Sequence, residues 1–228
     1  IKGSIDIFKK KNLDEKTKET MIVYVDDEIQ RLSRLVDEFL LFAKPKKPVL
    51  SKVSMLSFLT ETTEKLRFTV PDKNIKISLN VEDAYVECDV MLMERAILNI
   101  LKNSVEHSIP VDIDTNSENG YNNNTQDELQ VSIYDAYIEI DGRPQEPIGS
   151  KYIIEIKDRG KGIEESIIED IFNPFFTTRA KGTGLGLAIV KDIVGVHNGT
   201  VMVRNRPSGG AAFEIKIMAQ PVPSFFLK

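Results

Sequence analysis

The chain of 228 residues has little of the chemistry that marks secreted, disulfide-bonded or membrane-spanning proteins. Its single cysteine, Cys88, can form no internal disulfide and has no second thiolate for a metal site. No run of about 18 apolar residues is present, so no transmembrane helix is predicted. No secretory signal opens the chain, and since Ile1 is not a natural start we expect an upstream segment to be missing. These features favour a reducing, cytoplasmic setting.

A strong excess of basic charge is also lacking. The formal net charge is −5, which argues against a nucleic-acid-binding face. Basic clusters at residues 9–11 and 44–47 are short and lie near expected helix ends, where solvated termini are the simpler interpretation. We therefore expect no nucleic-acid partner and no membrane contact. The length and the 41% hydrophobic content suit one large domain, or a medium-sized domain with an appendage.

A heptad pattern dominates residues 21–43. The apolar positions, three and four residues apart, are Ile22, Val25, Ile29, Leu32, Val36, Phe39 and Ala43. Residues 1–10 show the same spacing and residues 12–16 separate the two stretches, so we expect an antiparallel helical hairpin over residues 1–44 with a short first arm. The hairpin either packs on its own domain or forms a bundle between subunits, and the strict heptad favours the bundle. Prolines at 45 and 48 mark a linker over residues 45–48.

Residues 49–219 show a mixed pattern of helices and strands. Strands are expected at residues 49–53, 75–81, 85–88, 130–140, 151–157, 201–205 and 211–218, with 75–81 and 85–88 forming a pair. Helices are expected at residues 54–68, 90–108, 163–172 and 186–197, and Asp89 is the expected N-cap of the second of them. Residues 111–128 are rich in Asn, Ser, Asp and Gly and are expected to form a mobile insertion. The pattern predicts an α+β fold with helices on one mixed, mostly antiparallel sheet, followed by a tail at 220–228.

Three elements carry candidate chemistry. The first is the alternation of Gly182, Gly184 and Gly186 directly before a helix, where backbone amides and the helix dipole can meet phosphate. The spacing is neither a Walker A loop nor a dinucleotide fingerprint, and a plain flexible turn is equally compatible with it. The second is Asp158 at the end of a strand, followed by Gly160 and Gly162. Such a carboxylate can accept a hydrogen bond from a base amino group, although an ordinary Asp-Gly turn has the same sequence.

The third element is a pair of amides, Asn99 and Asn103, on one face of the expected helix 90–108. They interrupt an apolar helix, and a buried amide without a partner costs about 1–3 kcal/mol. A shared ligand such as a hydrated cation with phosphates explains both amides, and capping of neighbouring backbone is the alternative.

In chain order, these elements together with residues 172–178 (Phe-Asn-Pro-Phe-Phe-Thr-Thr) resemble the N, G1, F and G2 boxes of sensor histidine kinases. The resemblance spans about residues 48–218, and the wording of residues 174–178 is similar to that of the nitrogen-regulatory subgroup. It implies a Bergerat-type ATP-binding fold, with the hairpin similar to the dimerisation and phosphotransfer domain of the family.

The resemblance also implies roles for the matched positions. Asn103 would coordinate Mg²⁺ that bridges the ATP phosphates, Asp158 would bind the adenine amino group, and residues 173–184 would form the ATP lid. Glu106 departs from the basic residue that the family often has at its position, and His197 is expected to be structural. The full expected nucleotide-binding set is Asn99, Asn103, His107, Asp158, Gly160, Gly162, Ile163, Thr178, Arg179, Gly182, Thr183, Gly184, Leu185, Gly186 and Leu187.

The position of Asn99 separates kinases from the gyrase-type ATPases and chaperones that share this fold. Those proteins carry a glutamate there that activates water, and a neutral amide cannot be a general base. The only histidines are His107 and His197, both inside the ATP-binding domain. The resemblance therefore implies an acceptor histidine upstream of residue 1 and no catalytic residue of its own in this chain. It further implies a homodimer through the hairpin and a response regulator that docks near residues 1–44. An ATP-driven conformational machine and a nucleotide-binding module without catalysis are the alternatives.

Overall fold

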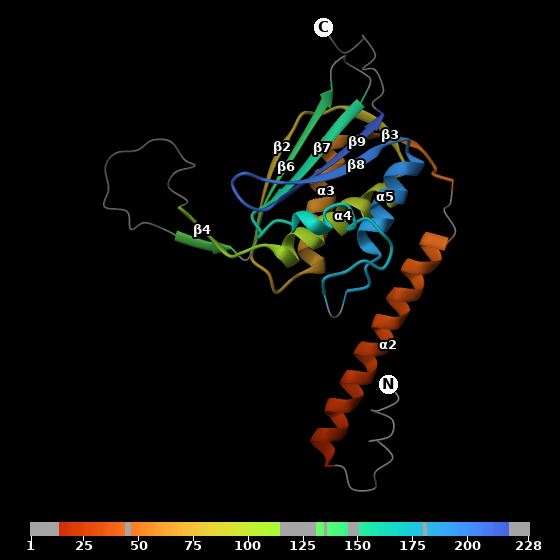
Figure 1. Ribbon diagram of the computed structural model, residues 1–228, viewed down its shortest axis with the longest axis vertical. Helices are drawn as coiled ribbons and strands as arrows, with labels where there is room; N and C mark the ends of the chain where they lie inside the picture. Colours follow the sequence, from red (N-terminus) through yellow and green to blue (C-terminus); the bar gives the residue numbers. More distant parts are fainter. Residues whose placement is uncertain are drawn as a thin grey trace. The chain divides into compact units, whose positions relative to one another are not determined.

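The computed structural model describes residues 14–43, 47–114, 131–134, 136–145, 151–179 and 182–218. The chain divides into two compact units, Ile1–Lys46 and Lys47–Lys228. Figure 1 shows the described part of the first unit as one long helix and the second unit as a sheet with helices on one face. The expected first arm of the hairpin, residues 1–10, lies outside the described residues.

Helix α2, Glu15–Ala43, forms the described part of the first unit. It begins after Asp14, whose Oδ1 accepts a hydrogen bond from the backbone N–H of Thr17 at 2.5 Å. Five of its heptad side chains are about half exposed, from 43% for Leu32 to 58% for Ile22; the others are Ile29, Val36 and Phe39. Residues 12–16 were expected to separate the two arms of the hairpin. This expectation was wrong at its C-terminal end, because Glu15 and Lys16 already belong to helix α2. None of the described helices has the length and apolar character that crossing a membrane requires.

The second unit is built on a five-stranded sheet in the order β2-β6-β7-β9-β8. The strands are β2 Ile75–Val81, β6 Ala136–Gln145, β7 Lys151–Asp158, β8 Thr200–Asn205 and β9 Ala211–Met218. Only β2 and β6 pair in parallel, and the other neighbours are antiparallel. Two ribbons accompany the sheet: β1 Ser51–Ser54 with β3 Tyr85–Cys88, and β4 Val111–Asp114 with β5 Val131–Tyr134. The expected mixed, mostly antiparallel sheet is confirmed.

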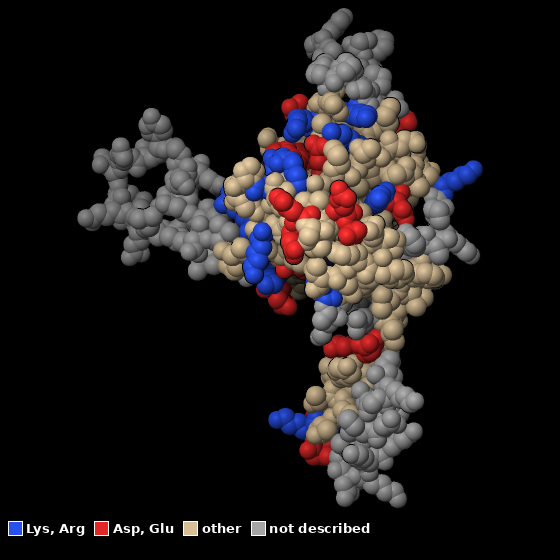
Figure 2. Space-filling model, in the orientation of Figure 1, with Lys and Arg blue, Asp and Glu red and all other residues tan. Residues whose placement is uncertain are grey.

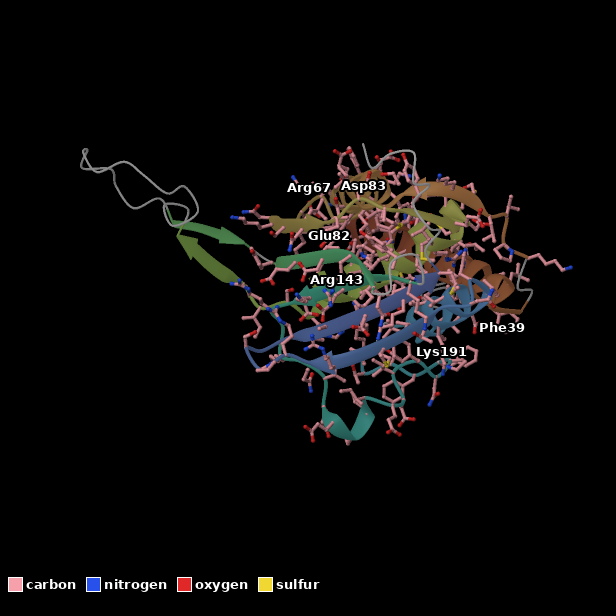
Figure 3. All side chains as sticks on the ribbon, turned by 90° about the horizontal axis from the view of Figure 1, so that it is seen from above. Phe39, Arg67, Glu82, Asp83, Arg143 and Lys191 are labelled. Atoms are coloured by element: carbon pink, nitrogen blue, oxygen red, sulfur yellow. The ribbon has the colours of Figure 1, made fainter. Side chains whose placement is uncertain are left out.

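Helices α3 (Met55–Thr69), α4 (Val90–His107) and α5 (Gly186–Val196) contact one face of this sheet. The register places Ile140, Ile156 and Phe213 side by side on the helix-facing side, and all three are buried. Side chains fill the layer between helices and sheet in Figure 3, where Lys191 on α5 and Arg143 on β6 are labelled.

The opposite face of the sheet is charged. Lys157 pairs with Asp141 and, at 3.2 Å, with Glu155, which also accepts a hydrogen bond from Arg204 at 2.5 Å. On the side of the second unit that Figure 2 shows, positive and negative side chains are interspersed. Alternation of apolar and charged residues thus decides which face of the sheet the helices cover.

Three sequence-based expectations were wrong in the second unit. Strands β2 and β3 do not pair with each other, because the turn between them is anchored elsewhere: Glu82 donates its N–H to Gly142 O at 2.8 Å, and its carbonyl accepts from the Tyr152 hydroxyl at 2.6 Å. Figure 3 labels Glu82 and its neighbour Asp83 at this turn. Residues 111–114 of the expected insertion form strand β4, and residues 115–128 lie outside the described residues.

The expected helix 163–172 is also absent. This stretch contains only the short 3₁₀ helix η2, Glu165–Ile167, and successive turns. The physical reason is Asn205, whose side chain accepts from the Ile163 N–H and donates to the Ile163 carbonyl, both at 2.7 Å. The Ile163 carbonyl, committed to the Asn205 side chain, is not free to accept the first hydrogen bond of a helix that would begin there.

Candidate functional site

Helix α4 carries the two amides and is fixed at its first turn. Asp89 is its N-cap: Oδ1 accepts from the Leu92 N–H at 3.1 Å and Oδ2 from the Val49 N–H at 2.9 Å. Burial, the largest single cause, acts to raise the pKa of Asp89. Hydrogen bonds from the backbone N–H groups of Val49, Leu92 and Met91 outweigh it, so the pKa lies below the ordinary 3.8. The expected cap is confirmed.

His197 joins the end of α5 to the start of α4. Its Nε2 accepts from the Asp89 N–H at 2.9 Å, so Nδ1 carries the proton that is shared with the Ile193 carbonyl at 2.7 Å. The side chain is 6% exposed. Both ring nitrogens are therefore bonded within the protein, which gives His197 a structural position, as the sequence predicted.

The two amides of α4 have different surroundings. Asn99 donates from Nδ2 to the carbonyl of Gly186 at 3.2 Å, and so ties α4 to the first residue of α5. Asn103, one turn later, is partly buried, and its side-chain amide makes no hydrogen bond with any described residue. One amide is thus committed to the protein and the other is available to a ligand.

Asp158 lies at the last position of β7 with 4% of its surface exposed. Its Oδ1 accepts two backbone hydrogen bonds, from Gly160 at 2.9 Å and from Ala211 at 3.0 Å. Its Oδ2 accepts none from the described residues. A buried carboxylate is costly unless both oxygens find donors, so the free oxygen is suited to a donor from a ligand.

The loop after Asp158 is closely packed against α4. A Cβ on Gly160 would lie 2.5 Å from the His107 carbonyl oxygen, and Gly160 forms an isolated bridge with Ser108. Gly162 has φ +77°, and a Cβ there would lie 2.7 Å from Asn205 Oδ1. These contacts bring the Asp158 loop to the C-terminal end of the helix that carries the amides.

The glycine-rich segment packs on residues 175–179. Gly184 has φ +69°, and a Cβ on it would lie 2.4 Å from the carbonyl carbon of Phe175. Phe175 itself has φ +66° and is 62% exposed. A positive φ is strained for an aromatic residue, and such strain concentrates at functional sites. Thr183 Oγ1 then accepts from the Leu185 N–H at 3.2 Å, directly before α5 begins.

The remaining expected site residues occupy the same region. Leu185 is buried, Leu187 is in the first turn of α5, and Thr178 and the side chain of His107 are exposed. Residues 180 and 181 of the expected lid lie outside the described residues. Two contacts thus join the three sequence elements around α4: Asn99 with Gly186, and His107 with Gly160.

Three residues at the site were missed from the sequence: Gly210, Arg206 and Ser104. Gly210 has φ +85°, and a Cβ on it would lie 2.1 Å from the Asp158 carbonyl oxygen, to which Arg206 also donates at 2.7 Å. The Gly-Gly pair before β9 was the available signal. Ser104, beside Asn103, is 1% exposed and its hydroxyl has no partner among the described residues. Glu106 pairs with Arg179.

The chain belongs to the family of histidine kinase-, DNA gyrase B- and HSP90-like ATPases, whose pattern matches residues 88–221. It is 26% identical to the signal transduction histidine-protein kinase AtoS of Escherichia coli, over 97% of this chain and 32% of that protein. It is 30% identical to the nitrogen regulation protein NtrY of Azorhizobium caulinodans, over 86% of this chain and 22% of that protein.

Solved structures show the same fold. The mycobacterial sensor histidine kinase MprB matches with a TM-score of 0.58 and 24% identity, over 76% of this chain and all of that one. Histidine kinase ThkA, in a complex with response regulator protein TrrA, matches with a TM-score of 0.69 and 23% identity, over 96% of this chain and 56% of that one. The chain spans at most about a third of the curated relatives' length. The expected Bergerat-type ATP-binding fold is thereby confirmed, and the named relatives are consistent with the catalytic domain of a histidine kinase.

Proposed function

We propose that this chain is the ATP-binding catalytic part of a protein-histidine kinase in a two-component signalling system. The observation that carries the proposal is the buried carboxylate of Asp158, which has one oxygen saturated by backbone and one free, at a loop packed on α4. The side-chain amide of Asn103, which has no hydrogen-bond partner among the described residues, lies on this same helix α4. The glycine-rich turn is joined to α4 by the hydrogen bond between Asn99 and Gly186. The relatives named as sensor histidine kinases support the reaction type.

The base would bind at Asp158. Its free Oδ2 is a hydrogen-bond acceptor, which suits the exocyclic amino group of adenine and would repel the carbonyl oxygen that guanine has at that position. Gly160, Gly162 and Ile163 shape the loop beside it. Ser104 offers a buried hydroxyl on the adjoining helix.

The phosphates would lie between Asn103 and the start of α5. The backbone of residues 182–187 and the N-terminal end of that helix favour anions, with Thr178, Thr183 and Arg179 beside them. Among the described residues no cluster of three or more His, Cys, Asp or Glu could hold a metal. Mg²⁺ fits the site all the same, because it is usually held by one or two protein oxygens plus phosphates and water, and the Asn103 amide oxygen can serve as one. Bound Mg²⁺ neutralises charge on the phosphates.

The chain positions ATP for transfer, and Asn99 cannot act as a general base for hydrolysis. Asn99 stands where the related ATPases carry a glutamate, and its amide nitrogen is held by Gly186. In the transfer, a nitrogen of an incoming imidazole forms a bond to the γ-phosphorus. The bond from that phosphorus to the bridging oxygen breaks, and ADP leaves with the electron pair. A response-regulator aspartate then takes the phosphoryl group from the histidine.

The acceptor histidine would lie on the dimerisation helix before residue 1. His197 is excluded as the acceptor, since it is buried with both nitrogens bonded. The half-exposed heptad side chains of α2 suit a homodimer through the hairpin. The complex of ThkA with TrrA supports a response regulator as partner. We expect it to dock near residues 1–44. The single buried thiol of Cys88, whose pKa burial raises to about 11, suits a reducing compartment such as the cytoplasm.

Calorimetric titration with ATP in the presence and absence of Mg²⁺ tests the site. The Asn103→Ala variant should lose about tenfold or more of the Mg²⁺-dependent affinity, in line with a hydrogen bond to a charged group. Asn80→Ala, which removes an exposed amide from β2, is the matched control and should bind as the wild type does. Incubation with a peptide dimer that carries the upstream histidine should then yield acid-labile phosphate. Absence of ATP binding by the wild type would overturn the proposal.

A further inference from the structure

An ion pair links helix α4 to the segment before the glycine-rich turn. Arg179 donates from Nη1 to Glu106 Oε2, with the two side chains 45% and 37% exposed. Among the described residues 173–179, this is the only hydrogen bond or ion pair with α4. The pair therefore decides where the guanidinium points when no other anion is present.

The backbone of Arg179 is held in a built turn. Its N–H donates to Thr177 Oγ1 at 3.1 Å, and its carbonyl accepts from the Gly182 N–H at 3.1 Å. A Cβ on Gly182 would lie 2.3 Å from the same Thr177 oxygen. Both backbone groups of Arg179 are thus hydrogen-bonded, and its side chain begins beside the expected phosphate path. Only the guanidinium group needs to move for Arg179 to exchange Glu106 for a phosphate.

Glu106 lies three residues after Asn103 and so shares its side of α4. A carboxylate at this position repels phosphate. It also forms an ion pair with Arg179, the cation of the turn. Lys102, one turn earlier on α4, has no ion pair with a described residue and lies within reach of Glu106 at an i, i+4 separation, although Lys before Glu is the weaker order of such a pair. An exchange of partners would therefore leave neither charge without a neighbour.

We propose that Glu106 is a displaceable counter-ion that holds Arg179 until nucleotide phosphate takes it over. This inference rests on the proposed function, since it concerns the phosphate end of the same site. Its consequence is that Glu106 weakens the binding of phosphorylated nucleotide and leaves the recognition of the base unchanged. Glu106 is then a determinant of affinity through Arg179, and the pair is exchanged without any covalent step.

The test compares Glu106→Gln with Glu94→Gln. The control removes the same charge from the same helix, but from a pair with Lys65. Calorimetric titrations use Mg-ATP and, as the probe without phosphate, adenosine. Glu106→Gln should bind Mg-ATP about two- to fivefold more tightly than the wild type, the range that an exposed ion pair supports. Adenosine affinity should stay the same, and Glu94→Gln should match the wild type with both ligands.

A second arm uses Arg179→Gln as background. There the gain from Glu106→Gln should shrink, because the cation that Glu106 holds is gone. Weaker or unchanged Mg-ATP binding in Glu106→Gln, with normal binding in Glu94→Gln, overturns this inference and leaves the proposed function intact. An equal gain for adenosine also overturns it. A wild type that binds no ATP overturns both.

Discussion

The turn between β8 and β9 provides a sharp test of how the Asp158 loop is built. Gly209 and Gly210 have nearly the same backbone conformation, with φ +88° and +85°. An alanine at either position pays the cost of a left-handed conformation, about 1–2 kcal/mol. Their surroundings differ: a Cβ on Gly209 would lie 3.9 Å from the Gly160 carbonyl oxygen, whereas one on Gly210 would lie 2.1 Å from the Asp158 carbonyl oxygen.

That carbonyl cannot rotate away, because it is backbone and accepts a hydrogen bond from Arg206. Relief of the overlap requires a backbone shift, which costs about 1–3 kcal/mol in a packed region. We therefore expect Gly210→Ala to lower the free energy of unfolding by about 1–3 kcal/mol more than Gly209→Ala does. Because the next residue, Ala211, donates to Asp158 Oδ1, the Gly210 variant should also bind ATP more weakly.

The assay is equilibrium denaturation in urea, with the ATP affinity of each variant measured by calorimetry. Gly195→Ala is the control for alanine as such: it lies in α5, and a Cβ there meets nothing within 4 Å. It should be neutral or stabilise by about 0.5–1 kcal/mol. Equal unfolding free energies for Gly209→Ala and Gly210→Ala would refute the close contact with the Asp158 carbonyl.

Two further predictions concern the ends of α4 and α5. Removal of the Asp89 cap in Asp89→Ala should cost about 1 kcal/mol of unfolding free energy at neutral pH. Since the folded pKa of Asp89 is depressed, this contribution is present above the ordinary pKa of 3.8 and is lost as pH falls through the folded value. Equilibrium denaturation of the wild type and of Asp89→Ala at neutral and acidic pH measures this loss, and a difference that does not narrow in acid would contradict it. Asn99→Asp should lower the unfolding free energy by about 1–3 kcal/mol, because a carboxylate cannot donate to the carbonyl of the first residue of α5. Thermal denaturation that shows no change in Asn99→Asp would contradict the role of that bond.

Sequence reasoning succeeded where the signal is local. Residues close together in the sequence were enough to predict the Asp89 cap and the helix that it starts. The same holds for the position of Asp158 at the end of a strand. The order of the motifs led to the correct family. Sequence reasoning failed over residues 163–172, where the apolar spacing suggests a helix. There the side chain of Asn205, distant in the chain, forms hydrogen bonds with both the N–H and the carbonyl of Ile163.

The sequence by itself determined the local elements, the amphipathic stripe of α2 and the identity of the family. Only the tertiary structure decided that β2 pairs in parallel with β6, that Asn99 is committed to α5 while Asn103 stays free, and that Glu106 faces Arg179. Caps and periodicity depend on neighbours along the chain, so they can be seen in one dimension. Strand partners and ion pairs between segments depend on how buried faces and backbone groups are satisfied together in space.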